Sequence, residues 1–152
     1  MQLDKRDRRI LALLQTDCRL SNAELADKVG MSHSACWRRV RGFEDQGIIE
    51  NYRAEVSPTK VGLTFQALVH VQLTRHNPEH LADFISAVEA RPEVLECYAT
   101  TGQADYHLRV LCRDIAAYNV FLEVFLFSLP AVDSAQTNVV LREIKRRHMI
   151  SV

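Results

Sequence analysis

The fold of this chain is decided around residues 21–47, which read SNAELADKVGMSHSACWRRVRGFEDQG. The segment opens with Ser21 and, three residues later, Glu24, a spacing at which the two side chains cap a helix start reciprocally. Gly30 then supplies a tight turn, and Ser32 has the position of an N-cap for a second helix that runs to the end of the segment. Two helices joined by a short glycine-containing turn predict a helix-turn-helix unit.

The second of these helices has two unlike faces. Cys36, Val40 and Phe43 stand at i, i+4 and i+7, which predicts a core stripe. The opposite face carries hydrogen-bond donors and cations, with no carboxylate before Glu44, and such a helix can lie in the major groove of DNA. An ordinary solvated helix in a helical bundle is the other interpretation, but the unpaired arginines favour nucleic acid.

A DNA-binding surface is therefore predicted on this face. Arg38 and Arg41 are expected to contact phosphate or guanine, and Trp37 to lie near the bases, although a lone tryptophan is also common as half-buried packing. Arg39 lies closer to the core edge and is expected to hold the backbone or the fold. The full predicted set is Ser21, Asn22, Ser32, His33, Ser34, Trp37, Arg38, Arg39 and Arg41.

The flanking segments complete a small domain. Residues 4–16 have aspartates at the start, which suit a helix N-terminus, and an apolar face that can cover the helix-turn-helix. Residues 48–56 alternate like a short strand and are expected to form a reduced wing or a connector, ended by Ser57-Pro58. The sequence thus predicts a winged helix-turn-helix domain over residues 1–62 and a second domain over residues 63–152.

From Leu63 the apolar pattern takes the period of a strand. Alternation over residues 65–73 predicts a strand buried on one face. The remaining expected elements are a helix from Asn77-Pro78 to Arg91, strands at 94–101 and 106–112 joined by a hairpin at 102–105, a helix from Asp114 to Pro130, and a strand at 132–142. This order predicts an α+β chain whose second domain is a ferredoxin-like βαββαβ fold.

Two helices cover only one face of such a sheet, so the other face meets water or a partner. It is expected to carry apolar residues mixed with His70 and Arg109, and this composition indicates a homodimer formed through the sheets. The apolar candidates are Leu68, Leu111 and either Tyr98 or Cys97. The second helix is apolar all round, which indicates either further assembly of dimers or deep burial in one subunit.

Composition limits the classes of protein. The chain has 152 residues, 47% of them hydrophobic and 25% charged, as in globular proteins. It shows no secretory leader, no apolar run long enough for a membrane span and four widely spaced cysteines, which fits a reducing, cytoplasmic location. The net charge is +2 over residues 1–47, −5 over 48–141 and +3 over 142–152. One copy would bind DNA weakly, because affinity is built from several phosphate contacts.

The hairpin Thr100–Tyr106 is the one compact polar group outside the helix-turn-helix. Backbone amides around Gly102 can hold a carboxylate, and Asp105 can hold an ammonium group, which together suit the charged end of an amino acid. The alternative is a plain hairpin whose aspartate caps its own backbone. The dispersed histidines predict no metal site, and the absence of a phosphate-binding loop or a nucleophile motif predicts a protein that is not an enzyme and has no cofactor.

The chain resembles the Lrp/AsnC (feast/famine) transcription regulators over essentially its full length. The resemblance rests on five segments in order: LDKRDRRILALLQTDCRLSNAELADKVGMS, RRVRGFEDQGII, KVGL, TGQADYHLRV and SLPAVDSAQTNVVLREIK. It implies a DNA-binding winged helix-turn-helix and a ferredoxin-like effector (RAM) domain that dimerises through its sheet and commonly assembles to an octamer. It also implies an amino acid or related effector bound between dimers by Thr101, Gly102, Gln103, Ala104, Asp105 and Thr137.

Two residues depart from the family pattern near the expected effector site. Ala131 stands where the family usually has glycine after the helix-ending proline, and Ala104 stands where an aromatic residue is frequent. We therefore expect a wider pocket or a different ligand.

The leading hypothesis is a sequence-specific DNA-binding regulator whose assembly or DNA binding responds to an amino acid. Two alternatives stay open at this point. One is an architectural DNA-coating protein of low specificity, which a specificity ratio near one would support. The other is a ferredoxin-like metabolite-binding protein whose helical front is an interaction module.

Overall fold

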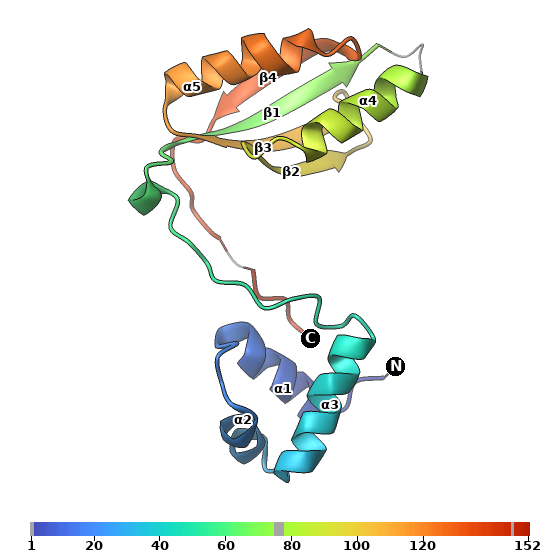
Figure 1. The fold of residues 1–152 in the computed structure, drawn as a ribbon, viewed down its shortest axis with the longest axis vertical. Helices are drawn as coiled ribbons and strands as arrows, with labels where there is room; N and C mark the ends of the chain where they lie inside the picture. Colours follow the sequence, from blue (N-terminus) through green and yellow to red (C-terminus); the bar gives the residue numbers. More distant parts are fainter. Residues whose placement is uncertain (1, 75–77, 147) are drawn as a thin grey trace. The chain divides into compact units, whose positions relative to one another are not determined.

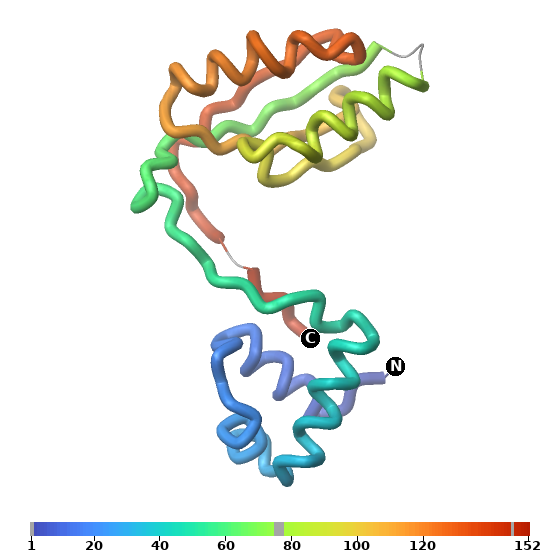
Figure 2. Tube along the Cα trace, viewed as in Figure 1, coloured from blue at the N-terminus to red at the C-terminus, as the bar shows by residue number. Residues whose placement is uncertain are grey.

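The chain forms two compact units in the computed structural model, which describes residues 2–74, 78–146 and 148–152 (Figure 1). The first unit is Met1–Glu55 together with Lys145–Val152, and the second is Val56–Ile144. The tube in Figure 2 shows that the chain passes from the helical unit into the sheet unit and that its last residues return to the helices. Among the described residues, no helix is long and apolar enough to cross a membrane.

The first unit is built from α1 (Lys5–Thr16), α2 (Asn22–Val29) and α3 (His33–Asp45). The capping box of Ser21 and Glu24 at the start of α2 is confirmed, and Asp4 and Asp7 form a second one at the start of α1. Gly30, with φ of 64°, ends α2 in the left-handed region that favours glycine. The buried core is Ile10, Leu11, Leu14, Leu25, Ala26, Cys36 and Phe43.

The segment after α3 was predicted to be a short strand that serves as a reduced wing or a connector. Residues 50–57 contain no strand in the structure, and Tyr52 and Val56 are 47% and 58% exposed. The alternation in this segment does not correspond to one buried face, so the prediction of a strand was wrong and the connector interpretation is correct. The connector ends in a 3₁₀ turn, η1 (Thr59–Val61), closed by Gly62.

The second unit is a four-stranded sheet with helices on one face (Figure 1). Its order is β2-β3-β1-β4 with antiparallel neighbours, which confirms the ferredoxin-like prediction. The strands are β1 (Phe65–Leu73), β2 (Val94–Ala99), β3 (Tyr106–Cys112) and β4 (Val132–Val139), and the α-helices are α4 (Pro78–Glu89) and α5 (Ile115–Val120). Both β2 and β4 end earlier than predicted, and the predicted helix start at Asn77 lies outside the described residues.

The helix predicted from Asp114 to Pro130 is not one regular α-helix. After α5 the chain forms a π-helical turn, η2 (Phe121–Phe125), and a 3₁₀ turn, η3 (Leu126–Ser128). The buried positions are Tyr118, Phe121 and Leu126, whereas Ile115 at the start of α5 is 62% exposed. The wider π turn accounts for the five-residue step from Phe121 to Leu126, which the regular spacing of an α-helix does not give.

Strand register settles which residues face away from the helices. His107 lies opposite His70 on β1 and opposite Tyr98 on β2, so Tyr98, and not Cys97, shares the open face with the histidines. Tyr98 and Leu68 are 57% and 43% exposed. Leu111 is only 8% exposed, so it does not contribute the open apolar surface that was expected of it.

Candidate functional site

The exposed face of α3 carries most of the predicted DNA-binding residues. Cys36 and Phe43 are buried on the opposite side and fix the rotation of the helix. The side chain of Ser32 accepts a hydrogen bond from the amide of Ala35 at 3.3 Å, which caps the helix start. The predicted residues that α3 and its cap bring to the exposed face are Ser32, His33, Ser34, Trp37, Arg38 and Arg41.

Arg39 points to the other side of the helix and holds the fold. Its Nη1 lies 2.6 Å from Asp4 Oδ2 and 2.6 Å from Asp7 Oδ1, and Asp7 is buried. Both aspartates cap α1, so this arginine joins α3 to the start of α1. The hydrogen bond from the Asp7 amide, followed by Arg39, lowers the pKa of Asp4. Of the two roles expected for Arg39, the contacts favour the structural one.

The arginines on the exposed face are not equivalent. Arg41 donates from Nη1 to Glu44 Oε2 at 3.2 Å, and its Nε lies 3.7 Å from Asp45 Oδ1. Arg38 is the one arginine of α3 without a carboxylate partner in the described part of the chain. Its charge is therefore the most available to a phosphate or a guanine.

The predicted residues at the start of α2 have partners inside the unit. The Ser21 hydroxyl lies 2.7 Å from Glu24 Oε2, and Asn22 donates to the backbone carbonyl of His33 at 2.9 Å. The amide of Asn22 thus ties the start of α2 to the start of α3. This hydrogen bond fixes the spacing between the two helix starts, and both starts carry residues of the predicted DNA-binding set.

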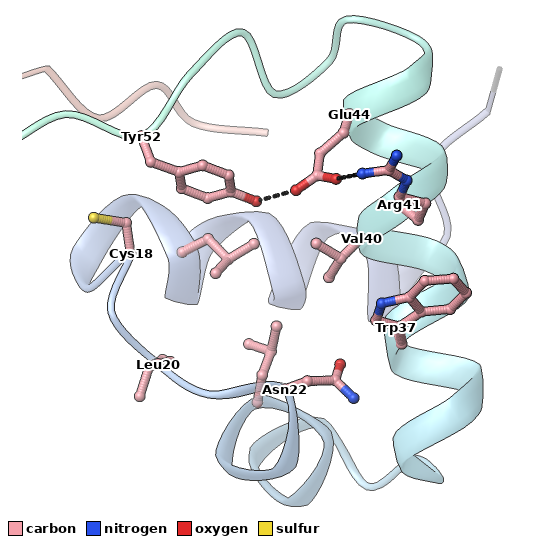
Figure 3. A pocket seen from close by; sticks show the side chains of 10 residues that line it. Cys18, Leu20, Asn22, Trp37, Val40, Arg41, Glu44 and Tyr52 are labelled. Atoms are coloured by element: carbon pink, nitrogen blue, oxygen red, sulfur yellow. Dashed lines mark hydrogen bonds and ion pairs between the residues drawn. The ribbon is translucent and has the colours of Figure 1, made fainter.

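A cavity of about 380 Å³ opens beside α3 (Figure 3). Apolar side chains such as Leu14, Leu25 and Val40 line it together with Trp37 and Arg41 on one rim. Tyr52, from the connector, lines the same cavity, and its hydroxyl donates to Glu44 Oε1 at 2.9 Å. Burial, reinforced by this hydrogen bond, raises the pKa of Tyr52 to about 12. Sequence reasoning missed Tyr52, because no periodicity links a connector residue to α3.

The hairpin between β2 and β3 is fixed by contacts with β1. Gly102 has φ of 134°, which a side chain would disfavour. Gln72 donates to the carbonyl of Gln103 at 2.7 Å. Asp105 Oδ2 accepts from the amide of Leu73 at 2.8 Å, and its own amide donates to Val71 O at 2.9 Å. One oxygen of Asp105 is thus engaged structurally, by the backbone of β1 and not by the backbone of its own hairpin.

Thr137 is separated from this hairpin within one protomer. Thr137 lies on β4, whereas the hairpin joins β2 to β3. In the sheet, β1 lies between β3 and β4. The Thr137 and Tyr118 hydroxyl oxygens are 2.6 Å apart beneath the helical layer. Thr101, Gly102 and Gln103 are exposed, whereas Ala104 and Ala131 are buried.

The described residues contain no group of three or more histidine, cysteine or acidic side chains that could hold a metal ion. Cys36 and Cys112 are buried thiols, and burial raises the pKa of each. Cys18 and Cys97 are exposed and unpaired.

Comparisons with known proteins agree on both units. Residues 66–150 match the model of the Lrp/AsnC ligand binding domain, and residues 3–50 match a winged helix-turn-helix DNA-binding model. The leucine-responsive regulatory protein of Escherichia coli strain K12 is 37% identical over 150 residues, which are 99% of this chain and 92% of that protein. The same figures hold for the protein of that name from Klebsiella pneumoniae.

Solved structures give the same result. A transcriptional regulator from Neisseria meningitidis, solved as a complex with L-Met, superposes with a TM-score of 0.94 at 40% identity, over 98% of this chain and 96% of that one. AsnC from E. coli superposes with a TM-score of 0.90 at 29% identity, over 98% of this chain and 99% of that one. The similarity thus spans both units.

Proposed function

Since this chain belongs to the Lrp/AsnC family of transcriptional regulators, we propose that the exposed face of α3 reads its operator DNA and that an amino acid controls its assembly there. The protein is a DNA-binding transcriptional regulator with a ligand-binding domain. The proposals concern which residues make the contacts, which ligand binds and how copies assemble. A regulator of this kind would act in the cytoplasm, where bacterial relatives meet their DNA.

The observation that carries the DNA assignment is the composition of one helix face. Six predicted residues share the exposed side of α3 and its cap, and Arg38 among them has no carboxylate partner in the described chain. A recognition helix places such donors at base edges, while its arginines also reach phosphates. Ser21 and Asn22, at the start of α2, would position the unit on the phosphate backbone.

Binding to DNA from the protein's own promoter region tests this assignment. The variant Arg38→Ala is expected to weaken binding and to reduce the magnitude of the salt slope by about one contact, as measured by mobility shift at several salt concentrations. Arg113→Ala, which removes the same charge from an exposed side chain of the second unit, is the matched control. Unchanged affinity for Arg38→Ala would remove this residue from the interface. A specificity ratio near one against random DNA would support a DNA-coating protein instead.

The effector proposal rests on the hairpin and on the relatives. The L-Met complex and the leucine-responsive proteins make apolar amino acids the first candidates. Backbone amides near Gly102 would receive the carboxylate, and the Asp105 carboxylate, which has one oxygen engaged by Leu73, would receive the ammonium group with the other. Thr137 would come from another copy, because β1 separates it from the hairpin in its own sheet.

Asp105→Asn separates the two roles of this aspartate. Asparagine keeps an oxygen that can accept from Leu73, but it loses the charge that would hold an ammonium group. We expect the unliganded variant to melt near the wild-type temperature and to lose the thermal shift that leucine or methionine gives the wild type. An equal ligand shift in both proteins would exclude Asp105 from the site.

Assembly is proposed to follow the two apolar surfaces of the second unit. A homodimer would form through the open sheet face that carries Leu68 and Tyr98, and dimers would associate further, up to an octamer, through the outer face of α5 and η2. Val120 and Val124 on that face are 57% and 69% exposed. An effector bound between dimers would favour one arrangement of copies and so change the spacing of the α3 helices along DNA.

A further inference from the structure

The connector contacts a DNA-facing arginine through a single carboxylate. Glu44 accepts a hydrogen bond from the Tyr52 hydroxyl on Oε1 and one from Arg41 on Oε2, at 2.9 and 3.2 Å. Figure 3 shows the tyrosine reaching from the connector and the arginine lying along α3, with the carboxylate between them. Tyr52 is the one side chain of residues 50–54 for which the described structure gives a hydrogen bond or ion pair.

Glu44 can either orient Arg41 or withhold it from DNA. The side chain of Arg41 is 60% exposed and that of Glu44 is 31% exposed. A guanidinium group has five N–H donors, so one bond to Glu44 leaves donors free for a phosphate. A carboxylate with both oxygens available can instead form a bidentate pair with the guanidinium group, with one hydrogen bond to each oxygen. The Tyr52 hydroxyl competes with that second mode, because its bond to Oε1 holds the carboxylate toward the connector and uses one of the acceptor sites of that oxygen.

We propose that Tyr52 is a positioning residue that, through Glu44, keeps Arg41 available to DNA. The connector leads directly into the ligand-binding unit, which begins at Val56. A change in the connector that withdraws the Tyr52 hydroxyl frees Oε1, lets Glu44 hold Arg41 with both oxygens and weakens the contact of Arg41 with phosphate. This inference rests on the proposed DNA-binding role of Arg41.

Tyr52 has two kinds of contact, the packing of its ring in the cavity and the hydrogen bond of its hydroxyl to Glu44. Its ring lines the cavity together with Trp37 and Arg41, so the ring alone would give it a packing role. The hydroxyl, however, points at a carboxylate that has a second partner on the DNA-facing side. Tyr52→Phe keeps the ring and removes only the hydroxyl, which separates the two roles.

The test uses the full chain and DNA from its own promoter region. Tyr52→Phe is expected to weaken binding by about threefold to tenfold and to lower the magnitude of the salt slope by about one, the share of one phosphate contact. In an Arg41→Ala background, Tyr52→Phe should have no further effect, because the relay then has no end point. The control is Thr16→Val, which removes an exposed hydroxyl bonded to the carbonyl of Ala12 within α1, outside the proposed binding and assembly surfaces, and should leave DNA binding unchanged.

Three results would overturn the inference. Wild-type affinity and salt slope for Tyr52→Phe would show that the hydroxyl does not act on DNA binding. An equal loss in the wild-type and Arg41→Ala backgrounds would show that Tyr52 acts through the fold and not through Arg41. If Arg41→Ala itself left binding unchanged while Arg38→Ala weakened it, the assignment of Arg41 would fail separately from the proposed function of the α3 surface.

Discussion

Two adjacent arginines of α3 illustrate how one step along a helix changes the role of a charge. Arg38 is exposed and has no carboxylate partner in the described chain, whereas Arg39 lies 2.6 Å from each of two carboxylates at the start of α1. Successive helical positions are about 100° apart, so neighbours face different surroundings. The sequence pattern placed Arg39 closer to the core edge than Arg38, but it contained no information on where α1 would pack and so did not predict the two aspartates that bind Arg39.

Arg38→Ala and Arg39→Ala should therefore affect different properties, DNA affinity in the first variant and folding stability in the second. We expect Arg39→Ala to lower the free energy of unfolding by about 1–3 kcal/mol, because it leaves the buried Asp7 with an oxygen that has lost its donor. Arg38→Ala should weaken DNA binding and leave stability within about 0.5 kcal/mol of the wild type. Urea denaturation and mobility shift measure the two quantities. Equal stability of the two variants would contradict the structural role of Arg39.

At the scale of the element, two glycines of the helix-turn-helix have opposite conformational roles. Gly30 has φ of 64° and ends α2, whereas Gly42 lies inside α3. A Cβ built on Gly30 meets nothing within 4 Å, and one built on Gly42 meets only Gln46 Nε2 at 3.7 Å, an ordinary contact. Neither substitution is therefore limited by space, so backbone conformation decides the effect of each.

Gly30→Ala is expected to destabilise the protein by about 1–2 kcal/mol, the cost of a left-handed conformation for a residue with a side chain. Gly42→Ala should stabilise it by about 0.5–1 kcal/mol, because alanine loses less backbone entropy in a helix. Thermal unfolding of the two variants beside the wild type measures the difference. A stabilising Gly30→Ala would mean that the turn between α2 and α3 is not built as observed.

The N-cap of α5 makes a contribution to folding stability that depends on pH. Asp114 caps α5 by accepting from the amide of Ala117 at 2.8 Å, and this bond, followed by Arg113, lowers the pKa of Asp114. A lowered pKa means that the ionised carboxylate contributes stability above its ordinary pKa of 3.8 and loses it as the pH falls through the folded-state value.

Asp114→Asn keeps a capping side chain but cannot ionise. The variant should melt below the wild type at pH 7, and the difference in melting temperature should shrink as the pH falls below 3.8. Thermal melting followed by circular dichroism at both pH values tests this. A difference that stayed constant with pH would show that the carboxylate charge does not contribute.

Local sequence signals predicted the regular helices and strands but not the irregular turns. Helix caps and apolar alternation are local features of the sequence. The sequence alone therefore predicted the helices α1, α2 and α3 and the strand β1. The π turn after α5 did not, because its register depends on packing Phe121 and Leu126 against the sheet. Likewise the sequence indicated the basic face of α3, but the pairing of Arg41 with Glu44 and of Glu44 with Tyr52 depends on side-chain directions and on a connector that has no period.

At the scale of the whole molecule, the chain passes between its two units twice. It enters the second unit at Val56, and residues 145–152 belong again to the first. The Gln15 side chain on α1 pairs with the backbone of Ile150, donating to its carbonyl at 3.1 Å and accepting from its amide at 2.7 Å. Val152 packs against the core of the first unit. The DNA-binding unit is thus joined to the ligand-binding unit by two covalent connections.

Charge makes assembly important for a molecule of this kind. The chain has no net charge, and its first 47 residues carry only +2. Because DNA affinity grows with the number of phosphates neutralised, one copy contributes few contacts and several copies on one operator contribute many. The two apolar surfaces of the second unit should then control DNA binding through assembly. The open sheet face would form the dimer, and the outer face of α5 and η2 would join dimers to one another.

Leu68→Glu and Val124→Glu separate those levels. Leu68 is 43% exposed in the open sheet face, and a carboxylate there would be buried in a sheet-to-sheet dimer while its cross-strand neighbour Arg109 is already paired with Glu96. We expect Leu68→Glu to give monomers by size exclusion with light scattering and to lose most DNA affinity. Val124, 69% exposed on η2, lies on the helical side of the sheet and not on the open face (Figure 1), so Val124→Glu should leave dimers that no longer associate and that bind a single operator site. Dimers that survive Leu68→Glu, or larger assemblies that survive Val124→Glu, would each contradict the surface assigned to that level, and the two variants serve as controls for one another because they add the same charge.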